Sequence, residues 1–294
     1  MSGPLPILVL GRSGQVAQML ARRAAQENAL VMLRGRGEID LLDQAAIMGA
    51  IRDVGAATVI NAAAYTAVDK AESEPEAAWR LNTQAPGVMA EACRACGVPL
   101  LHVSTDYVFD GSKTAPYLET DVTAPLGVYG QTKLAGEKAI QERYSRHIVL
   151  RTSWVFSDLG TNFVRTMLNL GRSRPLLKIV DDQVGGPTAA GDIAQALLTI
   201  ARHVARRDDL WGIYNFAGAP EVTWCGFARE IFHQAGLTPV VEPIATREYP
   251  TPAKRPANSI LDCSRIAANF GLPQPDWRLA LAEIVPILER NVQA

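Results

Sequence analysis

A tyrosine and a lysine spaced one helical turn apart are the residues of this sequence best suited to proton transfer. Tyr129 opens the segment 129–138, and Lys133 follows after three intervening residues. If the segment is helical, residues four apart lie on one face, so the phenol and the ammonium can serve one site. A free phenol has a pKa of about 10, whereas a proton donor works best with a pKa near the working pH. The lysine charge is expected to lower the phenol pKa, although an isolated pair of this kind also fits a solvated helix surface.

A glycine-containing loop near the start of the sequence is suited to binding a pyrophosphate. The apolar run Pro6 to Leu10 has the pattern of a buried parallel strand, and a helical pattern covers residues 19–25 after the loop. Glycines there permit a tight turn and let backbone amides approach a phosphate at the helix N-terminus. Ala17 replaces the last glycine of the dinucleotide-binding pattern, at a position that only sets helix packing. The loop supplies the first predicted cofactor-binding residues, Gly11, Ser13, Gly14, Gln15 and Val16.

Apolar runs that alternate with helical patterns predict the elements that position these residues. Strands are expected at 6–10, 29–33, 57–65, 99–103 and 148–151, and helices at 19–25, 44–54, 75–96 and 129–143. This alternation predicts an α/β fold with a doubly wound parallel sheet of the Rossmann type, whose ligand lies over the carboxyl ends of the strands. The glycine loop, Ala64, Thr105 and Tyr129 all fall at that edge.

After residue 153 the order is less regular and predicts a smaller C-terminal substrate-binding domain. Helices are expected at 162–171, 189–205, 224–235 and 279–291, strands at 176–180 and 212–216, and a loop at 181–188. Pro239 to Pro256 holds five of the 18 prolines, so we expect it to wrap over a ligand without regular structure. The predicted division is residues 1–153 for the cofactor and mainly 154–294 for the substrate, with segments near 189–216 packing on the first domain.

Composition and charge favour a protein with a small-molecule site. A net charge of -1 argues against a nucleic-acid or polybasic membrane surface, and 48% hydrophobic residues can build a sizeable core. No apolar run reaches the roughly 20 residues of a membrane span, and the stretch Met1 to Pro6 is too short for a signal peptide. We therefore expect a cytoplasmic protein.

Cysteines and histidines give no sign of a metal or redox site. Cys93 and Cys96 form a C-x-x-C within a helical pattern, without a second Cys or His pair nearby, so reduced packing thiols are expected. The histidines show no ligand spacing and are interpreted as structural. They are His102, His147, His203 and His233.

The motifs together resemble the extended short-chain dehydrogenase/reductase superfamily. The glycine loop, the run Asn61 to Ala64, Thr105 and the Tyr129/Lys133 pair carry this resemblance. More narrowly, five ordered blocks are similar to the dTDP-4-dehydrorhamnose reductase family, and the similarity spans essentially the whole chain. The blocks are residues 67–72, 104–111, 128–137, 151–155 and 249–256.

The resemblance implies reduction of the 4-keto group of dTDP-4-dehydro-L-rhamnose by NADPH, with NADH possible. This is the last step of dTDP-L-rhamnose synthesis, which serves carbohydrates such as lipopolysaccharide O-antigen. Tyr129 would donate the proton, Lys133 would hold the nicotinamide ribose, and Thr105 would bind the keto oxygen or the phenol. The implied cofactor site adds Arg34, Asp40, Leu41, Ala62, Ala63, Ala64, Tyr65 and Val103 to the loop, Tyr129 and Lys133. The implied substrate site comprises Thr105, Asp106, Tyr107, Trp154 and Arg255, whose fork suits a diphosphate.

Arginines at the end of the second strand favour NADPH over NADH. NAD-selective Rossmann proteins usually place an acidic residue there, which binds the ribose hydroxyls and repels a phosphate. Here Arg34 ends the strand and Arg36 follows, and both could clamp a 2′-phosphate. Asp40 comes six residues after Arg34 and is assigned to the adenine side.

Two other functions remain open at this stage. One is a sugar-nucleotide epimerase or dehydratase of the same superfamily, which would regenerate its cofactor in each cycle. The blocks at Trp154 and at residues 249–256 favour the reductase. The other is a non-catalytic, reductase-like regulatory subunit, against which the intact Thr105, Tyr129 and Lys133 argue.

A metal site is not expected. Some family members hold a metal between subunits through carboxylates, but the corresponding segments here read Gln18-Met19 and Ala189-Ala190-Gly191. The oligomeric state is left open, with a homodimer among the alternatives.

Overall fold

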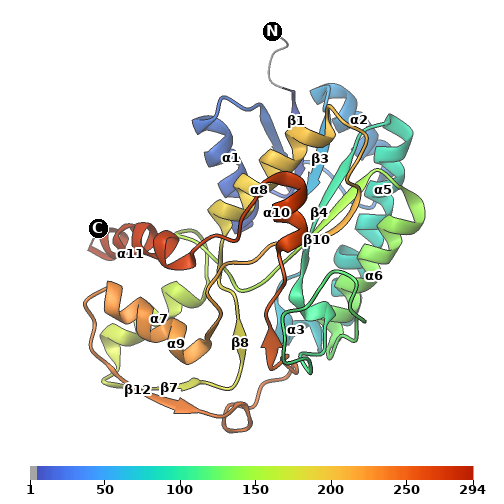
Figure 1. Ribbon diagram of the computed structural model, residues 1–294. Helices are drawn as coiled ribbons and strands as arrows, with labels where there is room; N and C mark the ends of the chain where they lie inside the picture. Colours follow the sequence, from blue (N-terminus) through green and yellow to red (C-terminus); the bar gives the residue numbers. More distant parts are fainter. Residues whose placement is uncertain (1–4, 294) are drawn as a thin grey trace.

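The computed structural model describes residues 5–293 and places them in a body built on one sheet, with a smaller lobe beside it (Figure 1). Predictions that concern Met1 to Pro4 and Ala294, including most of the stretch judged too short for a signal peptide, lie outside this range. No helix among the described residues combines the length and apolarity needed to cross a bilayer.

Six parallel strands form the sheet of the larger body, which confirms the predicted doubly wound α/β fold. Their order is β10-β5-β4-β3-β1-β2, and each neighbouring pair runs parallel. The strands are β1 Ile7–Leu10, β2 Val31–Arg34, β3 Thr58–Asn61, β4 Leu100–Thr105, β5 His147–Thr152 and β10 Gly212–Asn215. The chain passes from β2 across β1 to β3, so the strand order reverses at β1 and β3, where ligands of such sheets bind.

Helices cover both faces of this sheet (Figure 1). Apolar residues of α1 Gln15–Gln26, α8 Ala190–Val204 and α10 Ser264–Phe270 form a core on one face. Residues of α2 Gln44–Val54, α5 Ala85–Cys96 and α6 Val128–Arg143 form a second core on the other. Although α8, β10 and α10 come after residue 153, they belong to the larger body.

The smaller lobe has a core of its own. It packs α7 Phe163–Ser173, α9 Trp224–Gln234 and α11 Trp277–Gln293 around buried aromatic and aliphatic side chains. The strands β7 Leu176–Val180 and β12 Val240–Ile244 pair in parallel at its edge (Figure 1). Shorter elements complete the chain: α3 Val68–Ala71, β6 Val155–Phe156, β8 Val184–Gly185, β9 Thr188–Ala189, β11 Val222–Thr223 and β13 Asn258–Ser259.

Two predictions for this lobe are wrong in part. The proline-rich segment 239–256 is not wholly irregular, because it contains β12 and a 3-10 turn at Thr246–Glu248. Pro243 is accommodated because β12 has only one neighbour, so half of its N–H positions face away from the sheet. The segment 181–188, expected to be a loop, carries the two-residue strands β8 and β9.

A π-helical turn interrupts the long helix expected at 75–96. This turn, η1 Arg80–Gln84, lies between α4 Pro75–Trp79 and α5. Its buried Asn82 donates from Nδ2 to Tyr65 O and to Thr132 Oγ1, both at 3.1 Å, and its Oδ1 accepts from Tyr65 N at 2.8 Å. The turn therefore ties the loop after β3 to α6, as such π turns often do at functional sites.

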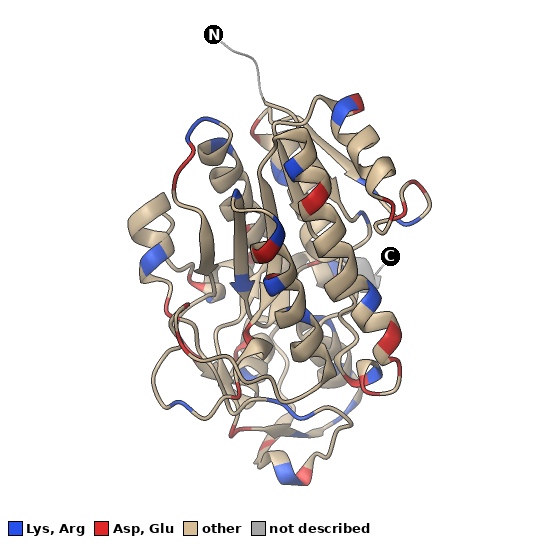
Figure 2. Ribbon diagram, turned by 90° about the vertical axis from the view of Figure 1, so that its right-hand side faces the viewer, with Lys and Arg blue, Asp and Glu red and all other residues tan. Residues whose placement is uncertain are grey.

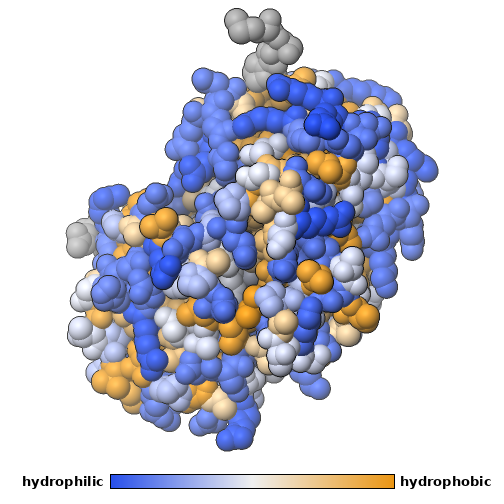
Figure 3. All heavy atoms as spheres, in the orientation of Figure 1, coloured by the Kyte–Doolittle hydropathy of each residue, from blue (hydrophilic) through white to orange (hydrophobic). Residues whose placement is uncertain are grey.

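The surface mixes charge and hydropathy. On the side shown in Figure 2, acidic and basic residues are interspersed over the helices. The face in Figure 3 is mostly hydrophilic, with separate apolar areas. On the side shown in Figure 2, the described residues form no broad basic surface of the kind that nucleic-acid binding uses.

Two helical glycines provide a matched test of the packing of α6. A Cβ on Gly136 would lie 2.0 Å from Asn82 O, whereas a Cβ on Gly49 of α2 meets nothing within 4 Å. Gly136→Ala is expected to lower the free energy of unfolding by about 1–3 kcal/mol, because the backbones must separate. Gly49→Ala is expected to raise it by about 0.5–1 kcal/mol. Urea unfolding measures both, and equal effects would contradict the close approach of α6 to η1.

Candidate active site

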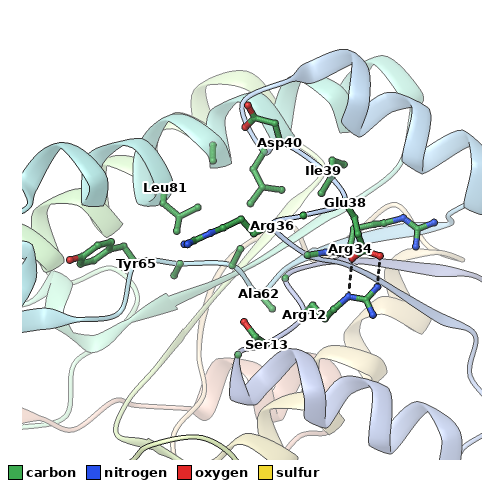
Figure 4. A pocket seen from close by; sticks show the side chains of 18 of the residues that line it. Arg12, Ser13, Arg34, Arg36, Glu38, Ile39, Asp40, Ala62, Tyr65 and Leu81 are labelled. Carbon is green, nitrogen blue, oxygen red and sulfur yellow. Dashed lines mark hydrogen bonds and ion pairs between the residues drawn. The ribbon is translucent and has the colours of Figure 1, made fainter.

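A cavity of about 1010 Å³ opens at the carboxyl ends of β1, β2 and β3 (Figure 4). The loops that follow these strands form most of its wall, and η1 with its neighbouring helices closes one side. Ten predicted cofactor-binding residues line it: Gly11, Ser13, Gly14, Arg34, Asp40, Leu41, Ala62, Ala63, Ala64 and Tyr65. The structure therefore gathers this part of the predicted site around one space.

The loop between β1 and α1 forms a cradle for an anion. Gly14 caps α1 without a side-chain hydrogen bond, and no acidic residue occupies the first turn. The N–H groups and the positive end of the helix dipole are thus available to a phosphate. Gly11 has a φ of 124°, and a Cβ there would lie 3.1 Å from Ala62 C, so the loop passes directly over the end of β3. A dinucleotide pyrophosphate fits these surroundings.

Three arginines, Arg12, Arg34 and Arg36, line the cavity after β1 and β2. Glu38 binds Arg12 through Nε at 2.8 Å and Nη2 at 2.6 Å, next to Arg34 (Figure 4). The Gly35 N–H, and then Arg12, hold the pKa of Glu38 below its usual value. Glu38 directs its side-chain hydrogen bonds to Arg12 and the Gly35 N–H, and neither Arg34 nor Arg36 forms an ion pair with it. Arg34 also donates to Leu33 O at 3.2 Å.

Some residues of this wall escaped the sequence reasoning. Arg12 lies inside the predicted loop, but its pairing with Glu38 depends on how the loops after β1 and β2 meet. Leu81 enters the wall through the π turn, which has the same apolar pattern as an ordinary helix. In Figure 4, Leu81 and Tyr65 lie at the end of the cavity opposite Arg12 and Glu38.

The remaining predicted cofactor residues lie outside this wall. They are Gln15, Val16, Val103, Tyr129 and Lys133. Gln15 accepts from Ser157 Oγ at 2.7 Å and Asn162 Nδ2 at 3.0 Å, which joins α1 to the segment before α7. Val16 and Val103 pack against the core between α1 and α8.

Lys133 lies in the predicted helix, one turn after Tyr129, and is almost fully buried. Its exposed fraction is 1%, and Nζ donates to Val103 O at 2.7 Å and lies 3.1 Å from His102 Nε2. Burial lowers the lysine pKa to about 8, against the opposing charge of Glu137. The amine is therefore held at the sheet, under the first turns of α6.

Tyr129 belongs to a cluster with the residues that follow β4. Its ring meets that of Tyr107 edge-on, with centroids 5.5 Å apart. Burial raises the pKa of the phenol to about 12; the Thr105 hydroxyl opposes this effect and the Asp106 charge adds to it. The expectation that Lys133 lowers this pKa is wrong, because desolvation dominates and the Lys133 side chain donates to Val103 O. The phenol is consequently held in its acid form.

Thr105 and Asp106 complete this cluster. Thr105 Oγ1 donates to Asp106 Oδ1 at 2.9 Å. Asp106 is 3% exposed, and its Oδ2 has no hydrogen-bond partner among the described residues. Burial raises the carboxyl pKa to about 6, and the Ser259 and Thr105 hydroxyls act against this rise. A hydrogen-bond donor of a bound ligand would satisfy this buried oxygen.

Gly130 of α6 has no side chain, and this allows the cluster to pack against the helix. A Cβ on Gly130 would lie 2.2 Å from Tyr107 O, so only glycine allows the turn after β4 to touch the helix. Tyr129 and Tyr107 are brought together by that contact.

Trp154 follows β5 at the same edge of the sheet. Its φ of 48° is uncommon for a bulky residue and is found at functional sites. The indole stacks on Trp224 of α9 with centroids 3.5 Å apart and an interplanar angle of 6°. Trp224 was not predicted as a site residue, because nothing in the sequence links it to Trp154.

Arg255 is engaged with acidic and hydroxyl side chains. It forms an ion pair with Asp69 Oδ2 at 2.9 Å and donates to Thr251 Oγ1. Its charge acts to lower the pKa of Tyr107 against the effect of burial. The structure thus places Arg255 beside the Tyr107 cluster, where a ligand phosphate would compete with Asp69.

A buried ion pair fixes α6 one turn beyond Lys133. Glu137 accepts from Arg151 Nη2 at 2.7 Å and from Ser104 Oγ at 2.5 Å. Glu137 and Arg151 are exposed by only 1% and 2%, and the Arg151 guanidinium also lies over the Phe109 ring at 5.1 Å. Two buried charges are stable only when each satisfies the other.

Residues 5–293 contain no grouped metal ligands and no disulfide-bonded cysteine. Among residues 5–293, no three His, Cys, Asp or Glu side chains are grouped so as to hold a metal ion. Cys93 is a buried free thiol whose pKa is raised by burial, and Cys96 is also free.

Comparisons with known proteins agree over nearly the whole chain. Residues 5–290 match the model of the RmlD substrate binding domain family. The dTDP-4-dehydrorhamnose reductase of Sinorhizobium fredii is 42% identical, over 95% of this chain and 96% of that protein. A solved dTDP-4-dehydrorhamnose reductase from Clostridium acetobutylicum superimposes with a TM-score of 0.91, at 33% identity, covering 97% of this chain and all of that one. The Bacillus anthracis reductase, solved in complex with NADP, gives a TM-score of 0.89 at 30% identity, covering 96% and 98%.

The ion pair under α6 can be tested by removing its acid. Glu137→Ala leaves Arg151 charged and buried without its partner, so a loss of about 3–5 kcal/mol in the free energy of unfolding is expected. Glu142→Ala is the control, because Glu142 lies on the same helix with 73% of its side chain exposed. Glu142→Ala is expected to lower the free energy of unfolding by less than about 1 kcal/mol. Similar losses in urea unfolding would show that the buried pair does not hold α6.

Proposed function

The chain belongs to the RmlD substrate binding domain family, and from this premise we propose that it is a dTDP-4-dehydrorhamnose reductase. It reduces the 4-keto group of dTDP-4-dehydro-L-rhamnose with NADPH, which yields dTDP-L-rhamnose. The observation that carries this function is the pairing of Tyr129 with the buried Lys133, one turn apart on α6, at the same sheet edge as a cavity with a phosphate cradle. An oxidoreductase needs both a dinucleotide site and a proton donor.

NADPH is the cofactor, and it supplies a hydride to C4 of the sugar. We assign its pyrophosphate to the N–H groups between Gly11 and α1, and its 2′-phosphate to Arg34 and Arg36. Asp40, Leu41 and Ala62 to Ala64 are assigned to the adenosine half. Their position around one cavity supports this assignment.

We propose that Tyr129 donates the proton that the reduced carbonyl oxygen requires. With a pKa of about 12, the phenol carries its proton at neutral pH and gives it up only to a stronger base, such as a developing alkoxide. Thr105 is assigned to hold the same oxygen by its hydroxyl. Lys133 is assigned to the nicotinamide ribose, which requires Nζ to turn from Val103 O towards the cofactor side.

The sugar nucleotide is assigned to the residues beyond β4 and β5. Asp106 and Tyr107 would contact the sugar, and Trp154, supported from behind by Trp224, would supply a rigid aromatic surface. Arg255 would bind the diphosphate, in exchange for or together with Asp69. We further assign residues 154–294 mainly to substrate binding, apart from α8, β10 and α10, which complete the larger body.

The cellular setting is a separate proposal. We place the enzyme in the cytoplasm, which is supported by its four free cysteines, since reducing compartments keep thiols unpaired. Its product would serve rhamnose-containing carbohydrates such as O-antigen. Two copies are proposed to associate as a homodimer, and a solution mass of twice the 31.7 kDa of one chain tests this.

The decisive test of the function is stoichiometry. Purified protein, dTDP-4-dehydro-L-rhamnose and NADPH are combined, and product and oxidised cofactor are counted. A reductase consumes one NADPH for each sugar reduced. An epimerase or dehydratase of this superfamily would convert sugar with no net consumption, and a regulatory subunit would convert none.

Replacement of the proton donor should separate chemistry from cofactor binding. Tyr129→Phe keeps the ring packed against Tyr107 but removes the hydroxyl, so kcat is expected to fall by roughly 100- to 10,000-fold. NADPH affinity, followed by fluorescence titration, should change little. Tyr144→Phe at the C-terminal end of the same helix is the control and should stay near the parent. A Tyr129→Phe enzyme within a few-fold of the parent would remove Tyr129 from the mechanism.

Cofactor preference should depend on Arg34. Arg34→Asp removes a phosphate ligand and introduces a charge that repels the 2′-phosphate, so kcat/KM for NADPH relative to NADH is expected to fall by about 10- to 100-fold. Arg52→Asp, on the exposed side of α2 and outside the cavity wall, is the matched control. Equal efficiency with both cofactors in the parent, unaltered by Arg34→Asp, would contradict the assignment.

A further inference from the structure

A buried histidine links Lys133 to the turn that lines the cofactor cavity. His102 of β4 lies directly beside Asn61 of β3 in the sheet register, and both side chains face α6. Asn61, His102 and Lys133 are each exposed by 1% or less. His102 Nδ1 lies 2.9 Å from Asn61 Nδ2, and His102 Nε2 lies 3.1 Å from Lys133 Nζ. The imidazole therefore touches a polar group at each ring nitrogen.

The hydrogen bonds that join Asn61, His102 and Lys133 are compatible with only one arrangement of their protons. The Ala63 N–H donates to Asn61 Oδ1 at 3.0 Å, so the amide must direct its NH₂ group at His102. An amide NH₂ only donates, hence Nδ1 of His102 accepts. Burial, with Lys133 and His147 nearby, lowers the pKa of His102 well below its ordinary value, so the ring is neutral. A neutral imidazole that accepts at Nδ1 carries its proton on Nε2.

That proton points at Lys133. An ammonium has donors only, whereas a neutral amine has a lone pair that can accept from His102 Nε2–H. One N–H of the amine donates to Val103 O, and the contact with His102 is satisfied only when Lys133 is uncharged. The other titratable groups near the pair are Glu137 and Tyr129 on α6 and His147 on β5. Glu137 favours the ammonium but is itself held by Arg151.

We propose that His102, oriented by Asn61, is a positioning residue that disfavours the charged form of Lys133 at the sheet and so directs the ammonium towards the cofactor ribose. In this arrangement the ammonium of a charged Lys133 faces the Nε2–H of His102, although it needs an acceptor there. Moving away from β4 relieves this contact between two donors. His102 is then more than the structural histidine expected from the sequence. The role of Lys133 at the ribose rests on the proposed function, but the tautomer of His102 does not.

The tautomer can be read without substrate or turnover. Histidine labelled with ¹⁵N gives distinct signals for protonated and bare ring nitrogens, and the His102→Gln spectrum identifies the signals of His102. At pH 7 we expect a neutral ring with the proton on Nε2. A proton on Nδ1, or a charged imidazolium, in the parent protein would overturn the proposal.

Asn61→Asp reverses the arrangement. Its carboxylate can still accept from Ala63 N–H but can no longer donate to His102, so the ring proton is expected to move to Nδ1. Nε2 then becomes an acceptor, which suits the ammonium of Lys133. If this variant does not fold, the spectrum of the parent still decides the proposal.

The effect of His102 on the charge of Lys133 is measured by following NADPH affinity as a function of pH. The lysine is charged below its pKa and neutral above it, so affinity in the parent should fall as pH rises through about 8. In Asn61→Asp this fall should move up by about one pH unit or more. His203→Gln is the control, since His203 is a partly buried histidine bound to Asp209 Oδ1 and is not among the groups near His102 and Lys133. If NADPH affinity falls at the same pH in the parent and in Asn61→Asp, the proposed link between His102 and Lys133 is overturned. Neither the ¹⁵N spectrum nor the NADPH titration requires turnover, so a failure of the reductase assay would not affect them.

Discussion

The buried polar contacts between α6 and β4 are the constraint on which the site depends. Lys133 and Glu137 lie one turn apart on the helix, and His102 and Ser104 lie two residues apart on the strand. Each spacing returns a side chain to the same face, so the two pairs fix both the rotation and the height of α6. Tyr129, one turn before Lys133, is then placed over the end of β4 without any freedom to turn away. An apolar interface of equal area would allow the helix to slide.

Close backbone contacts carry this constraint to the cofactor cavity. Gly136 lets α6 touch the π turn at Asn82, which in turn holds both backbone groups of Tyr65. Tyr65 and the alanines before it line the cavity, and Ala62 lies against the phosphate cradle at Gly11. The proton donor and the cofactor wall are therefore parts of one rigid unit, at the edge where the strand order reverses. Positioned groups of this kind reduce the entropic cost of reaction.

The sequence predicted what depends on local pattern and missed what depends on distant contacts. The helix at 44–54 was predicted with its bounds because Asp43 caps it and Gly55 ends it in the left-handed region. The π turn was missed because its apolar spacing resembles that of a helix, and the stacking of Trp224 on Trp154 was missed because only the folded lobe brings them together. The phenol pKa was predicted in the wrong direction, since it depends on burial. Activity was predicted from the family resemblance rather than from any single residue.

The origin of the hydrogen at C4 of the product tests the central claim most directly. The protein is given dTDP-4-dehydro-L-rhamnose and NADPH that carries deuterium at the transferred position of the nicotinamide, and the isolated sugar nucleotide is analysed by mass spectrometry and NMR. We expect dTDP-L-rhamnose with deuterium at C4, formed at the rate at which NADPH is oxidised. A product without deuterium at C4, or conversion of the sugar with the labelled cofactor left unoxidised, would contradict a reductase.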